Sequence, residues 1–477
     1  METIAQFGTG AFLRGFIGDF VDEANRAGRD IGSIVAIAST ESPRAAAFAA
    51  QGGRYTLMEQ GVSDGAAFRR RRAITATSRA LSAGTDWPAV LELARAPALR
   101  LVVSNSSEIG IATDPADGFD GQPPRSFPAK LTRFLYERAV ACSFDERRGV
   151  VVLPCELIDR NGDRLRALVV ELAVRWDLDA RFLRWLEASC RFCNTLVDRI
   201  VTGRPAPADL AQLTADIGYE DRLATVCEPY RLFAIEGDAT LRDRLGFGDS
   251  CRGLVVASDI TPFHTRKVRI LNGAHSVMAP VGLLAGIRTV REALEDKGVG
   301  GLARTAIFDE IVYGLEVEGG EAFARDVLTR FMNPFIRHEL ADITLQATAK
   351  IRARIVPSVR AYAARTGRAP SSLALGFAAH LLLVCEHGPG DRHPVSHAAD
   401  AAAGRIRAAW ELADRSSEAG LHAFAHSICA DAELWGEDLA RLGGFGDTVG
   451  EHLALVRRDG IRAALDARPV ASPALAR

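Results

Sequence analysis

The sequence predicts an α/β protein with a doubly wound, mainly parallel sheet in its first half and a largely α-helical domain in its second. Three observations support this prediction. Short apolar runs alternate with helical patterns over residues 1–258, as in parallel sheets whose strands are joined by helices. A Gly-x-Gly turn follows the first apolar run, and from Thr261 onward almost every segment has helical periodicity. We therefore expect two domains, residues 1–258 and residues 259–477.

The overall composition is typical of a globular protein with more than one domain. The chain has 477 residues, and 58 basic and 60 acidic residues give a formal net charge of -2. This balance provides no basic surface for nucleic acid or for an anionic membrane. The longest apolar run, Leu373–Cys385, is too short to span a bilayer, and the N-terminus has neither a basic region nor an apolar signal core. We therefore expect a cytoplasmic protein with no nucleic acid and no membrane among its partners.

The N-terminal segment has the pattern of a dinucleotide-binding turn. A buried strand over Thr3–Phe7 is followed by the Gly-x-Gly of Gly8 and Gly10, and then by an amphipathic helix over Ile17–Arg26. Such glycines let the backbone approach a pyrophosphate, while the helix N-terminus offers N–H donors and a positive dipole. Leu13 stands where a third glycine is usual. The prediction is a Rossmann-type domain, and the alternative is a tight turn without a ligand.

The end of the second strand is where a Rossmann-type domain contacts the ribose of its dinucleotide. This strand is predicted over Gly32–Ala38, and Glu41 follows it. Glu41 could bind the 2′-hydroxyl of NAD, whereas Arg44 could favour the 2′-phosphate of NADP. The shorter distance of Glu41 from the strand favours NAD. Solvent exposure is the alternative for both side chains.

Strands and helices alternate through the rest of this half. A buried strand that starts at Arg100 ends in polar residues, which include Asn105 and Glu108. Ligands of open α/β sheets bind beyond the carboxyl ends of the strands, so both residues are candidate cofactor neighbours. The arginine run Arg69–Arg72 is expected to be a solvated strand edge. Other predicted strands are Tyr55–Val62, Arg69–Thr75, Glu228–Glu236, Gly253–Asp259 and one starting at Gly149, and the predicted helices are Asp86–Ala94, Phe127–Val140 and Asp163–Arg175.

A lysine, an asparagine and a histidine share one side of the helix predicted from Thr261. Asn272 and His275 follow Lys267 by five and eight residues. At about 100° per residue, Asn272 lies about 140° and His275 about 80° from Lys267 around the helix axis. The alternative to a functional trio is a helix edge with a solvated lysine and a capped histidine. Further helices are predicted at Arg291–Lys297, Arg304–Val317, Glu321–Asn333, His338–Ile355, Leu373–Cys385, Ala399–Arg415 and Gly420–Leu442.

The eight cysteines are scattered along the chain. Cys190 and Cys193 form a C-x-x-C pair, but a structural zinc site requires a second pair, and the sequence has none. Buried free thiols and no metal are therefore expected, and a zinc dehydrogenase is the alternative.

Four ordered blocks resemble the mannitol dehydrogenase family, the long-chain polyol and aldonate dehydrogenases. They are Gly8-x-Gly10-x-Phe12-x-Arg14, Asn194-x-x-Val197-Asp198-Arg199, Lys267-x4-Asn272-x2-His275 and Arg330-x-x-Asn333-Pro334. The resemblance implies an NAD-dependent, metal-independent hydride transfer between a secondary alcohol and a ketone. By position it makes Lys267 the general base, lets Asn194 and Asn272 polarise the reacting oxygen, and places His275 on the substrate.

The resemblance also implies cofactor and substrate contacts. Ala11, Phe12 and Arg14 belong to the N-terminal block around the cofactor, and Arg330, Asn333 and His338 occupy substrate positions. Leu13 in place of a third glycine is itself typical of the family.

The chemistry of hydride transfer requires residues of these types. Burial lowers the pKa of a lysine and lets it exchange protons near neutral pH, while amide donors stabilise charge on the oxygen without adding charge. Within the family, several stretches are most similar to enzymes that act on ketouronic acids. Such a sugar acid needs a cation for its carboxylate, and Arg330, Arg337 and His338 are the expected sources.

Several alternatives to this function stay open from the sequence. They are the same chemistry on an epimeric ketouronate or on a polyol, and a non-catalytic protein that senses NAD. The oligomeric state is not set by the sequence, and a monomer is the expectation.

Overall fold

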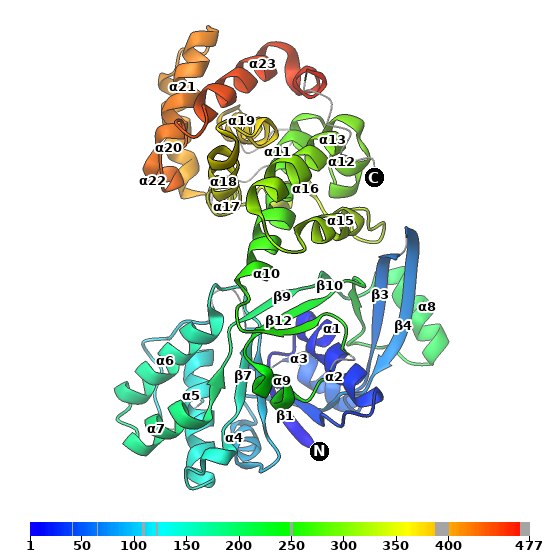
Figure 1. The fold of residues 1–477 in the computed structure, drawn as a ribbon. Coiled ribbons are helices and arrows are strands. Elements are labelled where there is room, and N and C mark those ends of the chain that lie inside the picture. The colour runs from blue at the N-terminus through cyan, green and yellow to red at the C-terminus, as the bar shows by residue number, and fades with distance from the viewer. Residues whose placement is uncertain are drawn as a thin grey trace. The chain divides into compact units, whose positions relative to one another are not determined.

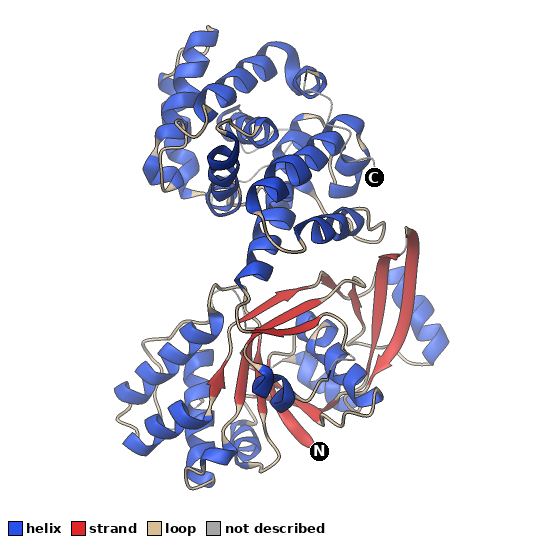
Figure 2. Cartoon of the chain, in the orientation of Figure 1, coloured by secondary structure: helices blue, strands red, loops and turns tan. Residues whose placement is uncertain are grey.

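The computed structural model describes residues 1–40, 42–63, 65–106, 110–120, 123–248, 251–386 and 400–467. The chain divides into two compact units (Figure 1). The first contains Met1–Ser63 and Phe68–Ile260, and the second contains Asp64–Ala67 and Thr261–Arg477. Figure 2 shows that strands are concentrated in the first unit, while the second is built from helices. This arrangement confirms the predicted α/β half and the predicted helical half.

A six-stranded parallel sheet forms the centre of the first unit. Its strands are β1 (Glu2–Phe7), β2 (Ser33–Ala38), β5 (Thr77–Ser82), β6 (Leu101–Ser104), β7 (Val151–Pro154) and β8 (Arg191–Phe192), in the order β5-β2-β1-β6-β7-β8. This is the strand order of a dinucleotide-binding Rossmann fold, in which the direction of winding reverses between β1 and β6. The outer strand β5 was not predicted from the sequence.

Helices cover both faces of this sheet because its side chains alternate between two apolar cores. Ile4 packs with α1 (Ala11–Gly15) and α2 (Ile17–Arg26), whereas Ala5 and Phe7 pack with the other helical layer. That layer is formed by α4 (Trp87–Arg95), α5 (Phe127–Ala141), α6 (Asn161–Arg175) and α7 (Ala180–Ser189) (Figure 1). The two-residue period of a strand sends successive side chains to opposite faces, so both cores depend on the same short strands.

Two smaller sheets complete the first unit. One has the order β10-β11-β3-β4, from β3 (Tyr55–Ser63), β4 (Ala66–Ile74), β10 (Val201–Gly203) and β11 (Thr225–Cys227). The other has the order β13-β12-β9, from β9 (Thr195–Asp198), β12 (Leu232–Glu236) and β13 (Leu254–Ala257). The remaining helices are α3 (Pro43–Ala50), α8 (Pro207–Ile217), α9 (Ala239–Leu245) and the short turn Glu146–Arg148.

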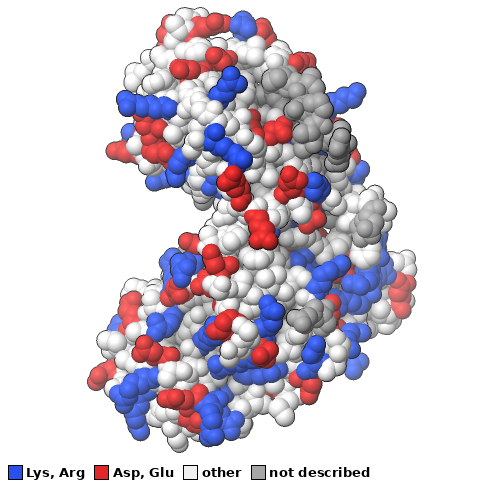
Figure 3. All heavy atoms as spheres, in the orientation of Figure 1, with Lys and Arg blue, Asp and Glu red and all other residues white. Residues whose placement is uncertain are grey.

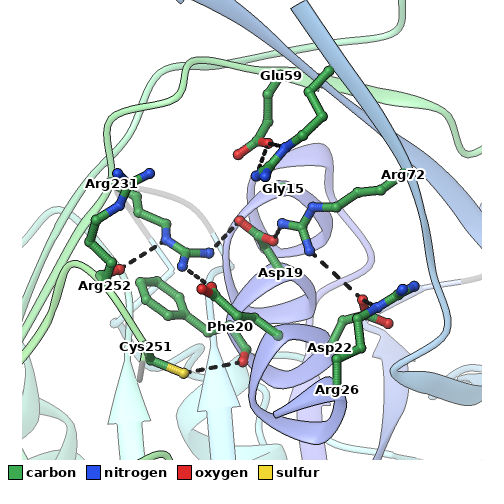
Figure 4. A network of polar contacts seen from close by, with 12 residues as sticks. Gly15, Asp19, Phe20, Asp22, Arg26, Glu59, Arg72, Arg231, Cys251 and Arg252 are labelled. Carbon is green, nitrogen blue, oxygen red and sulfur yellow. Dashed lines mark hydrogen bonds and ion pairs between the residues drawn. The ribbon is translucent and has the colours of Figure 1, made fainter. Parts of the chain in front are cut away.

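Three arginines from different elements meet one buried carboxylate in the first unit. Asp19 on α2 is fully buried and pairs with Arg72, with Arg199 at 2.5 Å and with Arg231 at 2.6 Å. Figure 4 shows Arg72 and Arg231 pointing at Asp19 from opposite sides. Arg199 also pairs with the buried Glu59 on β3, at 2.9 Å. We call these residues the Asp19 network.

The Asp19 network corrects one prediction about the arginine run. Arg69, Arg70 and Arg71 have side chains that are between about a third and half exposed, whereas the side chain of Arg72 is 18% exposed. The expected solvated edge is therefore wrong for Arg72. A charged side chain is rarely buried without a partner, and its partner Asp19 lies on a helix far away in the sequence.

After Thr261, the named elements of the second unit that the structure describes are all helices. Its first helices are α10 (Thr261–Arg266), a π-helical turn η2 (Lys267–Leu271) and α11 (Asn272–Leu284). The others are α12 (Val290–Glu295), α13 (Lys297–Thr305), the π-helical η3 (Ala306–Val312), α14 (Tyr313–Leu315), α15 (Gly320–Phe331), α16 (Leu340–Ile343), α17 (Ala347–Arg354), α18 (Val356–Thr366), α19 (Ser371–Glu386), α20 (Ala401–Leu412), α21 (Glu418–Ala430), α22 (Ala432–Trp435) and α23 (Phe445–Asp466).

The centre of the second unit is the packing of α11 against α19. Gly376 on α19 lies so close to α11 that a Cβ atom there would meet Val277 Cγ1 at 2.8 Å. The buried Glu310 on η3 accepts hydrogen bonds from the backbone N–H groups of Ser372 (2.7 Å) and Leu373 (2.9 Å) at the start of α19. This carboxylate satisfies donors that a helix N-terminus leaves free. Two predicted helices are shorter in the structure, because His338–Ile355 contains the break between α16 and α17, and Gly420–Leu442 ends its main helix at Ala430.

Acidic and basic side chains are interspersed on the surface. On the face shown in Figure 3, blue and red groups alternate over both units. None of the helices that the structure describes is long and apolar enough to cross a membrane.

Candidate active site

The loop between β1 and α1 contains two glycines that serve different purposes. Gly8 has a φ of 132°, and a Cβ atom there would approach Leu13 Cδ1 to 2.8 Å and the Asn105 carbonyl oxygen to 3.0 Å. Gly10 has an ordinary φ of -64°, and among the described residues beyond its chain neighbours no atom lies within 4 Å of a Cβ built on it. The backbone therefore requires glycine at residue 8, whereas at residue 10 the absence of a side chain leaves open space.

This open space lies where a Rossmann fold binds the pyrophosphate of its cofactor. Gly10 is the N-cap of α1, and the half-buried Ala11 and Phe12 form the first helical residues. The loop follows β1 at the reversal point between β1 and β6. Backbone N–H groups and a glycine that permits close approach are the donors that a dinucleotide pyrophosphate needs. The first unit thus has a Rossmann fold, and the glycine loop has the backbone donors and the space to hold a dinucleotide.

Arg14 stabilises the glycine loop between β1 and α1. Its buried guanidinium donates to the Thr9 carbonyl (2.6 Å), to the Leu223 carbonyl (3.1 Å) and to Thr225 Oγ1 (3.0 Å). These bonds tie the glycine loop to β11. We therefore expect Arg14 to act by holding the loop in place, a role that the N-terminal motif alone does not distinguish from cofactor contact.

A buried glutamate orders the segment that follows β6. Asn105 is half-buried and donates from Nδ2 to the Cys155 carbonyl at 2.7 Å. Glu156, at the end of β7, accepts from Ser104 Oγ, from Ser106 Oγ and from the Ser106 N–H, each at 3.0 Å. Glu156 belongs to none of the predicted site residues, although the rule that ligands bind beyond the carboxyl ends of strands applies after β7 as it does after β6. The predicted cofactor residues Glu41 and Glu108 lie outside the described residues.

Replacing Gly10 by alanine tests whether the open space is reserved for a cofactor. The φ of Gly10 suits any residue, and an alanine Cβ atom there would contact none of the described residues beyond its chain neighbours. We therefore expect the melting temperature to be unchanged or slightly raised. If a pyrophosphate occupies the space, the Kd for NADH should rise about tenfold or more, a loss of about 1.4 kcal/mol. Fluorescence titration with NADH measures it. Gly118→Ala is the matched control, because Gly118 also has open space around its Cβ position. Equal NADH affinity in both variants would contradict the assignment.

The predicted catalytic trio lies on a helix that contains one wide turn. The backbone N–H of Asn272 donates to the Lys267 carbonyl, five residues earlier, and residues 267–271 form a π-helical turn. The expected separation of about 140° between Lys267 and Asn272 assumed the regular α-helical spacing of about 100° per residue and does not hold. The i→i+5 bond instead places Asn272 about one turn after Lys267. Such π-helical turns are frequent at functional sites.

The side chains of Lys267 and Asn272 are both half-buried, so each keeps access to solvent or to a ligand. The carbonyl oxygen of Asn272 accepts a hydrogen bond from Ser276 Oγ at 3.0 Å. Ser276 Oγ in turn accepts a hydrogen bond from Arg354 Nη1 on α17, at 3.3 Å. The backbone of Asn272 is thus linked to α17.

His275 is a buried, neutral imidazole. Its ring stacks on Phe331 with 4.3 Å between centroids and meets His338 edge-on at 4.9 Å. Burial, and then the nearby positive groups of His338, Arg354, Arg330 and Lys350, hold the pKa of His275 well below its usual range. Among the described residues, Nε2 of His275 has no hydrogen-bond partner. A buried ring nitrogen without a partner costs about 1–3 kcal/mol, and a substrate hydroxyl could satisfy it once the surrounding side chains move apart.

Two of the predicted substrate residues, Arg330 and His338, lie near His275. Arg330 and Asn333 are buried at the end of α15, where the Asn333 N–H donates to the Arg330 carbonyl at 3.1 Å. His338 is half-buried, and burial lowers its pKa. Arg337 is exposed and pairs with Glu339 at 2.5 Å. Arg337 is therefore a poor source of the cation that a sugar acid needs.

Asn194 belongs to the first unit and is held by two carboxylates. Its Oδ1 accepts from the Asp163 N–H at 3.1 Å, and its Nδ2 lies 3.2 Å from Asp163 Oδ2 and 3.4 Å from Glu236 Oε1. The side chain is 5% exposed. For Asn194 to donate to a substrate oxygen, the substrate has to replace one of these carboxylate contacts.

The cysteine pair has the properties of buried thiols. All eight cysteines are free, and burial raises the pKa of both Cys190 and Cys193 to about 12. Zinc binds the thiolate form of cysteine, which these pKa values disfavour. Within the part of the chain that the structure describes, no group of three or more His, Cys, Asp or Glu side chains could hold a metal ion.

Two domain models of one family match most of the chain. Residues 2–247 match the mannitol dehydrogenase Rossmann domain, and residues 259–419 match the mannitol dehydrogenase C-terminal domain. An altronate oxidoreductase of Bacillus subtilis is 38% identical over 465 residues, which is 98% of this chain and 95% of the relative. An altronate oxidoreductase of Klebsiella pneumoniae is 37% identical over 467 residues, which is 97% of this chain and 96% of the relative.

Two solved structures share the fold of this chain. Mannitol 2-dehydrogenase of Pseudomonas fluorescens, solved with NAD and D-mannitol, aligns with a TM-score of 0.68 at 23% identity and covers 98% of this chain and 94% of its own. A D-sorbitol dehydrogenase in substrate-free form aligns with a TM-score of 0.77 at 22% identity and covers 97% of this chain and 94% of its own.

Proposed function

Because this chain belongs to the mannitol dehydrogenase family, we propose that it is an NAD-dependent oxidoreductase that reduces D-tagaturonate to D-altronate in the breakdown of hexuronates. The observation that carries this proposal is the nearly full-length match to relatives named altronate oxidoreductase. The glycine loop supports a dinucleotide, and the π-helical turn supports a paired lysine and asparagine. NAD is proposed over NADP from the position of Glu41 after β2.

Each catalytic residue has a proposed role in the reduction. The glycine loop would hold the nicotinamide cofactor, which would supply the hydride for the ketone carbon. Lys267 donates the proton that the ketone oxygen gains, and in the reverse direction it accepts that proton as a general base. The amide of Asn272 donates to the same oxygen, which stabilises the negative charge that develops there. Asn194 contributes a second amide after it exchanges a carboxylate contact.

The residues around the lysine hold the rest of the substrate in this proposal. His275 is neutral, so its ring can donate to or accept from a hydroxyl next to the reacting carbon without adding charge. Phe331 and His338 fix the plane of that ring from two sides. A ring held in this way restricts the orientation of the substrate, which is the main contribution of positioning to catalysis.

Initial rates of NADH oxidation with D-tagaturonate, D-fructuronate and D-fructose test the proposed substrate. We expect kcat/KM for D-tagaturonate to exceed that for D-fructuronate by at least about tenfold, because one misplaced hydroxyl costs about one hydrogen bond. D-Fructose, which has no carboxylate, should be slower still. A higher kcat/KM for D-fructuronate or for D-fructose would show that this compound, and not D-tagaturonate, is the preferred substrate. NADH binding without turnover of any of the three would indicate a sensor.

A further inference from the structure

Helix α17 carries two cations that no motif of the sequence pointed to. Lys350 and Arg354 are four residues apart, so they project from one face of the helix. Both side chains are half-buried, whereas Arg352, between them in the sequence, is exposed. Arg354 Nη1 donates to Ser276 Oγ at 3.3 Å, and Lys350 Nζ donates to the Ile343 carbonyl at 3.0 Å. This face of α17 therefore points toward α11, the helix of Asn272 and His275.

A cavity opens beside these cations. Its enclosed space is about 10 Å³, room for about one water-sized group, and Lys350, Ser276, Thr344 and His380 supply its polar lining. Among the described residues that line it, the others are apolar and none is an aspartate or a glutamate. Hydroxyl and cationic groups around a small cavity suit a single anionic group such as a carboxylate.

The cavity lies along the same face of α11 as the catalytic asparagine. Ser276 follows Asn272 by four residues and is bonded to its carbonyl, so it lies about one turn, 5.4 Å, further along the helix axis. Ala279 and Pro280, which also line the cavity, continue this face by another turn. A short sugar chain with its ketone oxygen at Asn272 can therefore reach the cavity with its other end.

Positive charge is concentrated at this point of the second unit. Lys350, Arg354, Arg330 and His338 all lower the pKa of the buried His275 ring. Burial lowers the pKa of His338 itself, so the positive charges near the ring are those of the lysine and the two arginines. A carboxylate that reaches this face of α17 meets two of them, Lys350 and Arg354.

We propose that Lys350 and Arg354 bind the carboxylate of the substrate, and that this pair makes the site selective for ketoses that carry a carboxylate over uncharged ketoses. This inference rests on the proposed reduction of a ketouronate. It names the residues that would make the site prefer a ketouronate to an uncharged ketose. Ser276 already donates its one hydroxyl proton to the Asn272 carbonyl, so its part is to orient Arg354, from which it accepts a hydrogen bond. Arg337, the source expected from the sequence, is exposed and already paired with Glu339.

The test compares the kinetics of one charged and one uncharged ketose. Arg354→Gln and Lys350→Met should each raise KM for D-tagaturonate by about 10- to 100-fold, because a hydrogen bond to a charged group contributes strongly to binding. Their kcat for D-tagaturonate and their KM for D-fructose should change by no more than about twofold, since the uncharged substrate leaves this pair unused. Arg354→Lys should recover part of the affinity for D-tagaturonate.

Arg352→Gln is the matched control, because it removes the same charge from the exposed face of the same helix. Its KM for both substrates should match the unaltered protein. An unchanged Kd for NADH shows that each variant is folded. Equal increases in KM for D-tagaturonate and D-fructose would overturn the carboxylate role while leaving the proposed function intact. An unaltered protein that reduces D-fructose but no ketouronate would overturn the proposed function, and this inference with it.

Discussion

Lys267→Ala is expected to lower kcat for D-tagaturonate by about 100- to 10,000-fold, the usual contribution of a positioned general acid or base. The ketone oxygen must gain a proton as the carbon gains its hydride, and water has to supply that proton when the ammonium group is absent. The Kd for NADH should stay within about twofold, a shift of less than 1 kcal/mol. This is because Lys267 belongs to the second unit, whereas the glycine loop belongs to the first.

Single-turnover reduction and NADH fluorescence titration measure the two quantities separately. Lys297→Ala is the control, because Lys297 is an exposed lysine in the same unit. Added primary amines should restore part of the lost rate in Lys267→Ala if the missing group is a proton donor. A parallel loss of NADH affinity and turnover would show that Lys267 serves the cofactor instead, and the proton-transfer role would have to be given up.

The N-terminal half of the fold was predictable because its signals are local. β1, the glycines and α2 follow one another within a short segment, and the predicted helix Ile17–Arg26 has the bounds of α2. β5 was missed because Thr77–Ser82 contains Ser78 and Arg79, whose side chains are exposed at the edge of the sheet. Their polar character hides a parallel strand whose pairing with β2 depends on the rest of the sheet.

The wide turn at Lys267 could not be predicted from spacing. A five-residue separation in an α-helix places two side chains on different parts of the surface, and only the i→i+5 bond from Asn272 to Lys267 changes this. The π-helical η2 packs against η3, which is also π-helical. The geometry thus depends on contacts between segments that are distant in the sequence.

The cation pair on α17 was hidden for a related reason. Lys350 and Arg354 lie in a segment that was predicted as one helix from His338 to Ile355. In a single continuous helix, the position of each side chain around the axis follows from its place in the sequence. The break between α16 and α17 resets that register. Which cations face α11 therefore follows from the structure and not from the pattern.

The Asp19 network leads to the second large effect. Three arginines surround a fully buried carboxylate, and Arg199 among them belongs to the block that starts at Asn194. Removing one partner from a buried ionic group costs about 3–5 kcal/mol, because the remaining charges stay buried without compensation. Asp19→Asn keeps the shape of the side chain and removes only its charge. We expect it to destabilise the first unit by this amount.

The unfolding transition that NADH shifts upward identifies the first unit, because a ligand stabilises the unit that binds it. In Asp19→Asn this transition should fall by roughly 10 °C. Asp216→Asn is the matched control, since Asp216 pairs with Arg71 from the same arginine run at the surface. An exposed pair contributes little because solvent screens it, so its transition should move by no more than a few degrees. If the transition of Asp19→Asn lies at the same temperature as that of Asp216→Asn, the charge of Asp19 does not stabilise the first unit. Packing and backbone contacts would then hold the three arginines.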